Sequence, residues 1–322
     1  MYWLRRRLGC AGRERLRIVA TLRASVGEVW SAPQRAVGWS AAQTAAFAQA
    51  YRLQDLARAV RGRGDAESLA RIAWWGSALA DLAPADVDAD GCAQRGEVLG
   101  ICAAFNLAVA LFDTAIDEAP IPRLALVEAL APRRLHSRLY QPDSEATRLR
   151  SEHPAAALVV GLFDQALTDI GHRFAGQHAR LDALITLLEA MYRSVLGQSD
   201  EPFIAKTGPV LFIGRVAAGD QAQRLYFELA RFCHIWDDAL DVAEDLVTLA
   251  PNHFLGTGRG VAMLSTLSYV GRGALRVVAG SAMHGDIERA LSMALRATVD
   301  AARDWNDESH AKTLSLCHAL LS

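Results

Sequence analysis

The sequence has little of what marks several large protein classes. Its five cysteines are odd in number and include no CxxC pair, so they fit free thiols in a reducing compartment and match neither a zinc site nor a disulfide framework. The net charge of −2 lacks the positive excess of a nucleic-acid-binding protein. The longest nearly apolar runs, 101–112 and 155–163, fall short of the roughly 18 residues that a membrane span needs. We therefore expect a cytoplasmic protein with no nucleic-acid partner and no transmembrane segment.

Strand signals are also missing, because no alternating run of Val, Ile and Thr is bounded by turn residues. Apolar residues instead recur at three- and four-residue spacing, which predicts an all-α fold. Residues 1–30 carry clustered arginines without a continuous apolar segment, so we predict a solvated basic arm and no signal peptide; contact with an anionic membrane surface is the alternative. Residues 31–322 contain no convincing linker and are predicted to form one helical domain of about ten helices.

What the sequence does have is a concentration of carboxylates in residues 232–246, FCHIWDDALDVAEDL, which contain no lysine or arginine. In a helix, Asp237, Asp241 and Asp245 would follow one another at i, i+4 and i+8, where like charges repel by roughly a few tenths of a kcal/mol. We predict one helix of about 28 residues that ends before Pro251. Oxygen ligands suit Mg²⁺, so the stretch predicts a site for metal and diphosphate, with a solvated acidic helix face as the alternative.

Asp113 and Asp117 form a second acidic pair, one helical turn apart at the end of the apolar stretch 101–118. No lysine or arginine lies between Arg95 and Arg123. Two acidic sites without local cations, each on an otherwise apolar helix, could hold metal ions between them if the helices face each other across a cavity.

A third feature is the segment 197–212, GQSDEPFIAKTGPVLF. Lys206 and Thr207 directly precede Gly208 and Pro209, where we expect the helix to kink or restart and to leave backbone groups free. A lysine and a hydroxyl at such a break would suit contact with a phosphate group.

Taken together, these stretches resemble the polyprenyl diphosphate synthase family and, more broadly, the class I isoprenoid synthase superfamily. WDDALDVAEDL resembles the second aspartate-rich motif, DDxxD, AKTGPVLFIG the KT motif and GQSD the GQ..D segment, and DTAID stands at the place of the first aspartate-rich motif. The chain departs from the family in three places: no RRG follows the first motif, no GKxxRP-like segment occurs near the N-terminus, and PNHFLGTGRG replaces a lysine-rich stretch. These departures remove the groups that would bind isopentenyl diphosphate and leave those that ionise one allylic diphosphate.

The resemblance implies a class I terpenoid synthase-like helical barrel around an apolar cavity, with about three Mg²⁺ ions acting as Lewis acids on the leaving diphosphate. The catalytic carboxylates would be Asp113, Asp117, Asp237 and Asp241. The implied metal ligands are these four and Asp245, while it stays open whether Asp238 is a ligand as well.

The resemblance also implies contacts for the diphosphate and for the carbon chain. Lys206 and Thr207 would hold the diphosphate, and Arg193 lies where cyclases of the superfamily place a diphosphate-sensing arginine, with Arg215 and Arg231 as competing candidates. A carbocation needs an apolar cavity with aromatic faces. The predicted lining residues, for each of whose aromatic members core packing is the alternative, are Phe105, Val109, Phe112, Phe232 and Trp236. Phe105 would lie about 12 Å beneath the metal site, a depth that suits a farnesyl chain.

Residues Asp86 to Glu97, DVDADGCAQRGE, also satisfy the pattern of a calcium-binding loop. However, Ala93 stands where such loops carry a large apolar residue, Pro84 interrupts the incoming helix, and the sequence has no second loop to pair with it. We therefore favour an acidic turn that caps the following helix, and we expect no calcium there.

We predict a Mg²⁺-dependent class I terpene synthase, a lyase that ionises a linear prenyl diphosphate such as farnesyl or geranylgeranyl diphosphate, releases diphosphate and forms a terpene. The first alternative is a prenyl diphosphate synthase or another prenyltransferase with an atypical second-substrate site. The second is a non-catalytic partner subunit of such an enzyme. Whether the chain forms a homodimer is left open.

Overall fold

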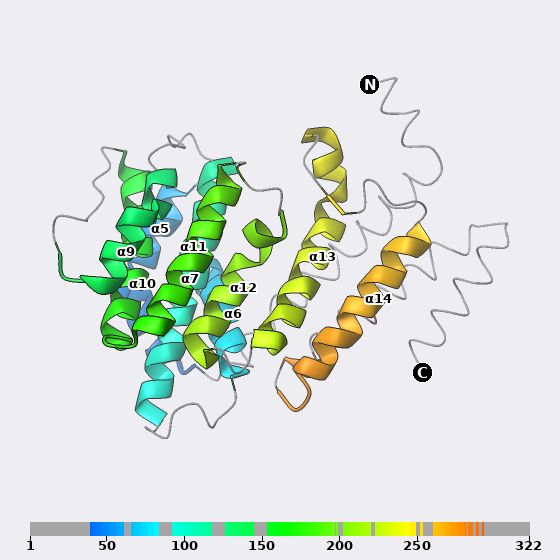
Figure 1. Cartoon of the computed structure of the whole chain (residues 1–322), viewed down its shortest axis with the longest axis horizontal. Coiled ribbons are helices and arrows are strands. Elements are labelled where there is room, and N and C mark those ends of the chain that lie inside the picture. Colours follow the sequence, from blue (N-terminus) through cyan, green and yellow to red (C-terminus); the bar gives the residue numbers. More distant parts are fainter. Residues whose placement is uncertain are drawn as a thin grey trace. The chain divides into compact units, whose positions relative to one another are not determined.

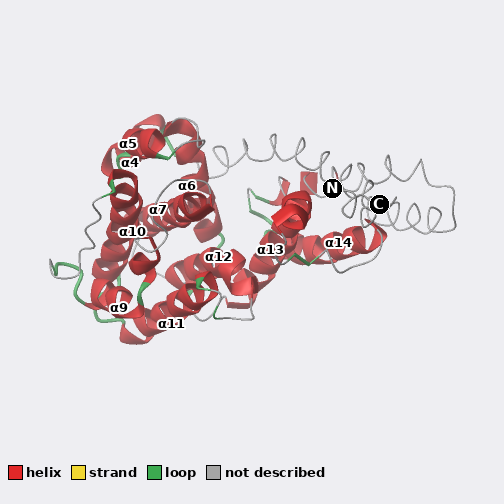
Figure 2. Ribbon diagram, turned by 90° about the horizontal axis from the view of Figure 1, so that it is seen from above, coloured by secondary structure: helices red, strands yellow, loops and turns green. Residues whose placement is uncertain are grey.

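The computed structural model describes residues 39–60, 66–83, 92–117, 126–144, 153–196, 198, 202–219, 223–248, 252–253, 260–281, 283–285, 288–289 and 292. These residues form ten α-helices and one short 3₁₀ helix, with no strand among them, which confirms the predicted all-α fold (Figure 1, Figure 2). The elements are α4 (Ala41–Ala50), α5 (Leu53–Ala59), α6 (Ala66–Asp81), α7 (Cys92–Asp117), η2 (Glu128–Leu130), α9 (Pro132–Tyr140), α10 (Pro154–Arg173), α11 (His178–Val195), α12 (Pro202–Ala218), α13 (Gln223–Thr248) and α14 (Gly260–Val277). The predicted basic arm, 1–30, lies outside the described residues.

The chain divides into two compact units, and the boundary falls within α13. Residues Pro33–Phe227 form the first, which we call the large unit. Met1–Ala32 together with Glu228–Ser322 form the second, the small unit. Each unit is described by itself below, and a single domain over 31–322 stays a prediction.

α7 is the core helix of the large unit, where it contacts α6, α10 and α12 (Figure 2). Every side chain from 101 to 112 is buried or half-buried, as expected for a helix that is apolar on all sides. The length and composition of Arg95–Ala115 would also suit a membrane span, but 67% of its most apolar window is buried within the protein. Burial of this kind is typical of the core helix of a soluble protein, but it does not test the point, and the absence of a transmembrane segment stays a prediction.

α6 and α7 approach each other closely. A Cβ atom at Gly76 would overlap the carbonyl oxygen of Cys102 and would lie 2.7 Å from Cβ of Asn106. Asn106 crosses the same contact, because its Nδ2 donates a hydrogen bond to the carbonyl oxygen of Ile72 at 2.7 Å. Gly76 is therefore required for the close approach, and the Asn106 amide joins the two helices.

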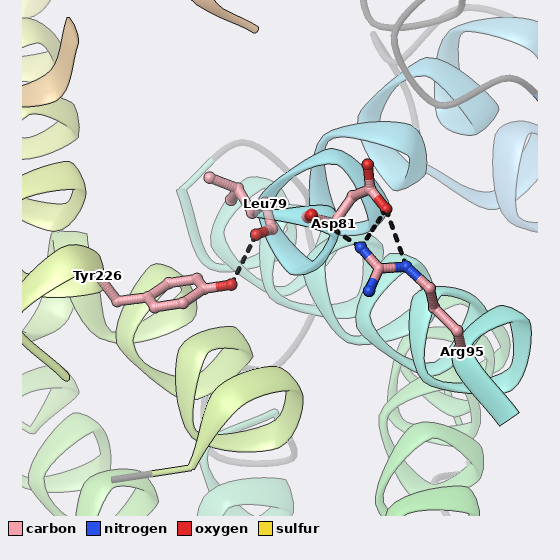
Figure 3. Close-up of polar contacts among 4 residues, drawn as sticks. All are labelled: Leu79, Asp81, Arg95 and Tyr226. Carbon is pink, nitrogen blue, oxygen red and sulfur yellow. Dashed lines mark hydrogen bonds and ion pairs between the residues drawn. The ribbon is translucent and has the colours of Figure 1, made fainter. Parts of the chain in front are cut away.

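The first turn of α13 is attached to α6 within the large unit. The buried Tyr226 hydroxyl donates to the carbonyl oxygen of Leu79 at 2.7 Å. Figure 3 shows this bond beside the pair formed by Arg95 at the start of α7 and Asp81 at the end of α6, with 2.8 Å between Nη2 and Oδ1. The two contacts hold the C-terminal end of α6 from two different helices.

α12 continues as one helix through Gly208 and Pro209, so the predicted restart of the helix there is wrong, while a kink stays a prediction. A proline inside a helix costs about 3 kcal/mol, and contacts with α11 offset this cost. A Cβ atom at Gly208 would lie 2.6 Å from Cγ of Met191. Arg180 donates to two carbonyl oxygens in the last turn of α12, at 3.0 and 2.8 Å. Tertiary contacts therefore decide the local structure here.

Candidate functional site

The first acidic motif lies in the last turns of α7. Asp113 is exposed, and Asp117 is the last residue of the helix, with its side chain outside the described residues. Magnesium ions keep several water molecules, so their ligands must face a hydrated site. The exposure of Asp113 meets this requirement.

The predicted cavity residues of α7 lie in the core below this motif. Phe105 is 0% exposed and stacks on Phe212 of α12 with 3.7 Å between ring centroids, and it meets Phe163 of α10 edge-on at 5.7 Å. Phe112 lies beside Phe163 at 6.1 Å, and Val109 is half-buried. Three helices thus contribute to one aromatic cluster. Its rings contact one another, as core packing requires, and a cavity lined by them stays a prediction.

The predicted diphosphate contacts lie on α11 and α12. Thr207 is fully buried, and its hydroxyl donates to the carbonyl oxygen of Phe203, one turn earlier. Lys206 is half-buried, and Arg193 is exposed in the last turn of α11. Because the Thr207 hydroxyl bonds within its own helix, it would have to exchange this partner before it could bind a phosphate oxygen.

α13 carries the second acidic motif on one helix of 26 residues, Gln223–Thr248, close to the predicted length. Asp237, Asp241 and Asp245 occupy successive turns of this helix. Asp237 is half-buried, and the side chains of the other two lie outside the described residues. Burial, and then the negative charge of Asp237, raises the pKa of Cys233 to about 12, so this thiol stays neutral at physiological pH.

Two aromatic residues precede the acidic motif on α13. Phe232 is buried, Trp236 is half-buried, and their ring centroids lie 5.5 Å apart. Trp236 directly precedes Asp237, and Phe232 lies about one turn before Trp236. The role of this pair in lining a cavity stays a prediction.

Asp238 has very different surroundings from its neighbour Asp237. It is 2% exposed, and its Oδ2 accepts a hydrogen bond from the backbone N–H of His253 at 2.8 Å. Its backbone carbonyl oxygen accepts a second bond from Nδ2 of Asn252 at 2.6 Å. The Nε2 atom of His234 lies 3.9 Å from the same carboxylate oxygen. Neither Asn252 nor His253 was predicted from the sequence, where the signal was a polar pair just after the proline that follows the helix.

The two acidic motifs belong to different units. Asp113 and Asp117 lie in the large unit, and 237–245 lies in the small unit. Among the side chains that the structure describes, no three His, Cys, Asp or Glu residues form a group that could hold a metal ion. Because Asp117, Asp241 and Asp245 are not among those side chains, the predicted ligand set stays a prediction.

The calcium-loop pattern falls mostly outside the described residues. α7 begins at Cys92, so the second half of the pattern is helical. Glu97, its last residue, is exposed, and its carboxylate lies 3.6 Å from Nε of Arg173. The acidic turn over 86–91 stays a prediction.

Comparisons of the chain with family models, with curated proteins and with solved structures gave no match. A function therefore has to be inferred from the residues of this chain. Three features bear on it: the carboxylate row of α13, the exposed Asp113 at the end of α7, and the aromatic residues that precede both motifs.

Proposed function

We propose that the protein is a Mg²⁺-dependent class I terpene synthase, which ionises one linear prenyl diphosphate and converts it to a terpene. The observation that carries the proposal is the row of Asp237, Asp241 and Asp245 on successive turns of one continuous helix, whose last turn contains no basic residue. Each repulsion in such a row costs roughly a few tenths of a kcal/mol. Bound cations would remove this repulsion, so the row is better suited to a metal site than to a plain helix surface.

The chemistry of the donors fits Mg²⁺. Carboxylate oxygens are hard ligands, and Mg²⁺ in proteins is held by one or two carboxylates, water and substrate phosphates. The proposed metal ligands are Asp113 and Asp117 of the first motif and Asp237, Asp241 and Asp245 of the second. Of these side chains, Asp113 is exposed and Asp237 is half-buried. When bound, the metal ions would supply Lewis-acid stabilisation of the departing diphosphate.

The other residues of the proposed site would bind the substrate and exclude water. Lys206 would contact the diphosphate, with Thr207 and Arg193 as further contacts. The resemblance to class I isoprenoid synthases implies a helical barrel around an apolar cavity, where Phe105, Phe112, Phe232 and Trp236 would present aromatic faces to the carbocation. Their positions before the two acidic motifs support this assignment.

Incubation of the purified full chain with Mg²⁺ and geranyl, farnesyl or geranylgeranyl diphosphate tests the proposal. We expect release of diphosphate and formation of a terpene in the absence of isopentenyl diphosphate, detected by gas chromatography and mass spectrometry, with farnesyl diphosphate the best substrate. A longer diphosphate that forms only with isopentenyl diphosphate would indicate a prenyl diphosphate synthase instead. No turnover of any substrate would contradict the proposal and favour a non-catalytic subunit.

Substitutions in both motifs test the metal assignment. Asp113→Ala and Asp241→Ala should each lower turnover by roughly 10² to 10³-fold, because each removes charge that stabilises the leaving group through the metal. Asp81→Ala is the matched control, since this exposed aspartate pairs with Arg95 outside both motifs and should leave turnover unchanged. Circular dichroism checks that the variants fold. Full activity in both motif variants would refute the assignment.

A further inference from the structure

Asp237 and Asp238 are sequence neighbours on α13, but they belong to different rows of the helix. Successive residues of an α-helix point about 100° apart. Asp237 begins the row that continues at i+4 and i+8 with Asp241 and Asp245. Asp238 instead follows His234 at i+4, and 3.9 Å separates His234 Nε2 from Asp238 Oδ2. The two carboxylates therefore lie on different sides of the helix.

The surroundings of Asp238 are those of a structural carboxylate. Its side chain is 2% exposed, and burial of a carboxylate is tolerated only when hydrogen bonds compensate the loss of water. The His253 backbone N–H, at 2.8 Å from Oδ2, gives this compensation and is itself satisfied. Asn252 adds a bond of 2.6 Å to the Asp238 carbonyl oxygen. One residue thus holds the following segment through both its side chain and its main chain.

A ligand of Mg²⁺ requires the opposite setting, because the ion keeps water and contacts substrate phosphates. Asp237 is half-buried, whereas Asp238 is closed off from solvent. We propose that Asp238 is a positioning residue that clamps Asn252 and His253 to the acidic helix, and that Asp237 is the metal ligand of the pair. The assignment of Asp237 as the metal ligand, which is the ligand half of the proposal, rests on the proposed function, whereas the clamp does not.

Amide hydrogen exchange of the metal-free protein tests the clamp without any measurement of activity. Asp238→Ala removes the acceptor of the His253 N–H, and loss of a hydrogen bond to a charged group should speed exchange in a peptide that contains His253 by about tenfold or more. Asp238→Asn retains an acceptor oxygen and should keep most of the protection. Asn252→Ala removes the bond to the Asp238 carbonyl but leaves the carboxylate acceptor of the His253 N–H in place, so it should give a smaller increase.

Asp237→Asn is the matched control one position away, and it should leave exchange of this peptide unchanged. The clamp would be overturned if Asp238→Ala exchanged like the parent protein, or if Asp237→Asn accelerated exchange to the same extent. If Asp238→Ala does not fold, Asn252→Ala decides the question, because exchange of this peptide that is unchanged in Asn252→Ala would overturn the clamp.

Calorimetric titration of MgCl₂ in the presence of inorganic pyrophosphate tests the ligand half. Asp237→Asn should weaken Mg²⁺ binding by about tenfold or more, whereas Asp238→Asn should change it by less than about threefold. Equal losses in both variants, or a larger loss in Asp238→Asn, would overturn the assignment of Asp237. If the parent protein binds no Mg²⁺ with pyrophosphate, the ligand half and the proposed function fail together, and the exchange result still decides the clamp.

Discussion

α7 and α13 are both 26 residues long and both carry aspartates toward their C-terminal ends, yet they are built differently. In α7, residues 101–112 are buried or half-buried on every side, and the exposed Asp113 follows directly. In α13, buried positions recur at helical spacing among charged residues, and Asp238 occupies one of them. This difference shows that a carboxylate on the buried side of a helix needs a hydrogen-bond partner within the protein. A carboxylate at the point where a core helix reaches solvent can be hydrated by water instead.

The largest loss of stability in this comparison of α7 with α13 should follow a substitution in the centre of α7. Phe105→Ala removes a ring that contacts Phe163 and Phe212, so the free energy of unfolding should fall by about 3 to 5 kcal/mol. Phe227→Ala is the control on α13, because its ring is 46% exposed, and it should cost no more than about 1 kcal/mol. Chemical denaturation measures both. A cost for Phe105→Ala as small as that of the control would contradict a stabilising role for the contacts of this ring with Phe163 and Phe212.

The next largest effect should come from the crossing of α6 and α7. Gly76→Ala places a methyl group against the carbonyl oxygen of Cys102, which is backbone and cannot rotate away, so the free energy of unfolding should fall by about 1 to 3 kcal/mol. Gly100→Ala on α7 is the control, since a Cβ there meets nothing within 4 Å. It should stabilise the protein by about 0.5 to 1 kcal/mol through helix propensity. If the melting temperatures of both variants shifted in the same direction, the expected difference between Gly76 and Gly100 would be contradicted.

A smaller effect should follow removal of the Tyr226 hydroxyl at the start of α13. Tyr226→Phe loses the bond to the Leu79 carbonyl, so the free energy of unfolding should fall by about 1 kcal/mol at neutral pH. Denaturation with urea at pH near 7 measures this loss, with the exposed Tyr269→Phe as the control.

The same variant changes how stability depends on pH. Burial raises the pKa of Tyr226 well above its ordinary value, so the unfolded chain releases this proton before the folded protein does. The neutral phenol therefore makes its full contribution to the free energy of unfolding below about pH 10, and this contribution is lost as the pH rises further. Tyr226→Phe should lose stability less steeply than the parent above that pH, by up to about 1.4 kcal/mol per pH unit. Parallel curves for the two proteins would contradict the shift.

Long helices were predictable from the sequence, whereas the course of α12 was not. α13 was predicted close to its observed length because the sequence has a signal at each end of the helix, Asp220 as a candidate N-cap and Pro251 as a residue that stops a helix. At Gly208 and Pro209 the local signal indicated a kink or a restart of the helix. The helix does not restart there, and the residues that contact it, Met191 and Arg180, lie far away in the sequence. Such contacts have no local signature.

For the candidate site, the sequence predicted the acidic residues but not their surroundings. Helix spacing alone separates the row of Asp237 from that of Asp238. The partner of the Asp238 carboxylate, the backbone N–H of His253, is 15 residues away, and any residue except proline could supply it. Likewise, the sequence does not reveal that the Thr207 hydroxyl bonds to Phe203.

The smallest effect should come from the exposed start of α7. Arg95 pairs with Asp81 at 2.8 Å and also donates to the Asp81 carbonyl at 3.0 Å (Figure 3). The two side chains are 43% and 51% exposed, so solvent screening should limit the contribution of the pair to about 0.2 to 1 kcal/mol. A double-mutant cycle of Arg95→Gln and Asp81→Asn measures this coupling, which should shrink in about 1 M salt. A coupling as large as the loss caused by Gly76→Ala would mean that α7 is held at its exposed end as firmly as in its core.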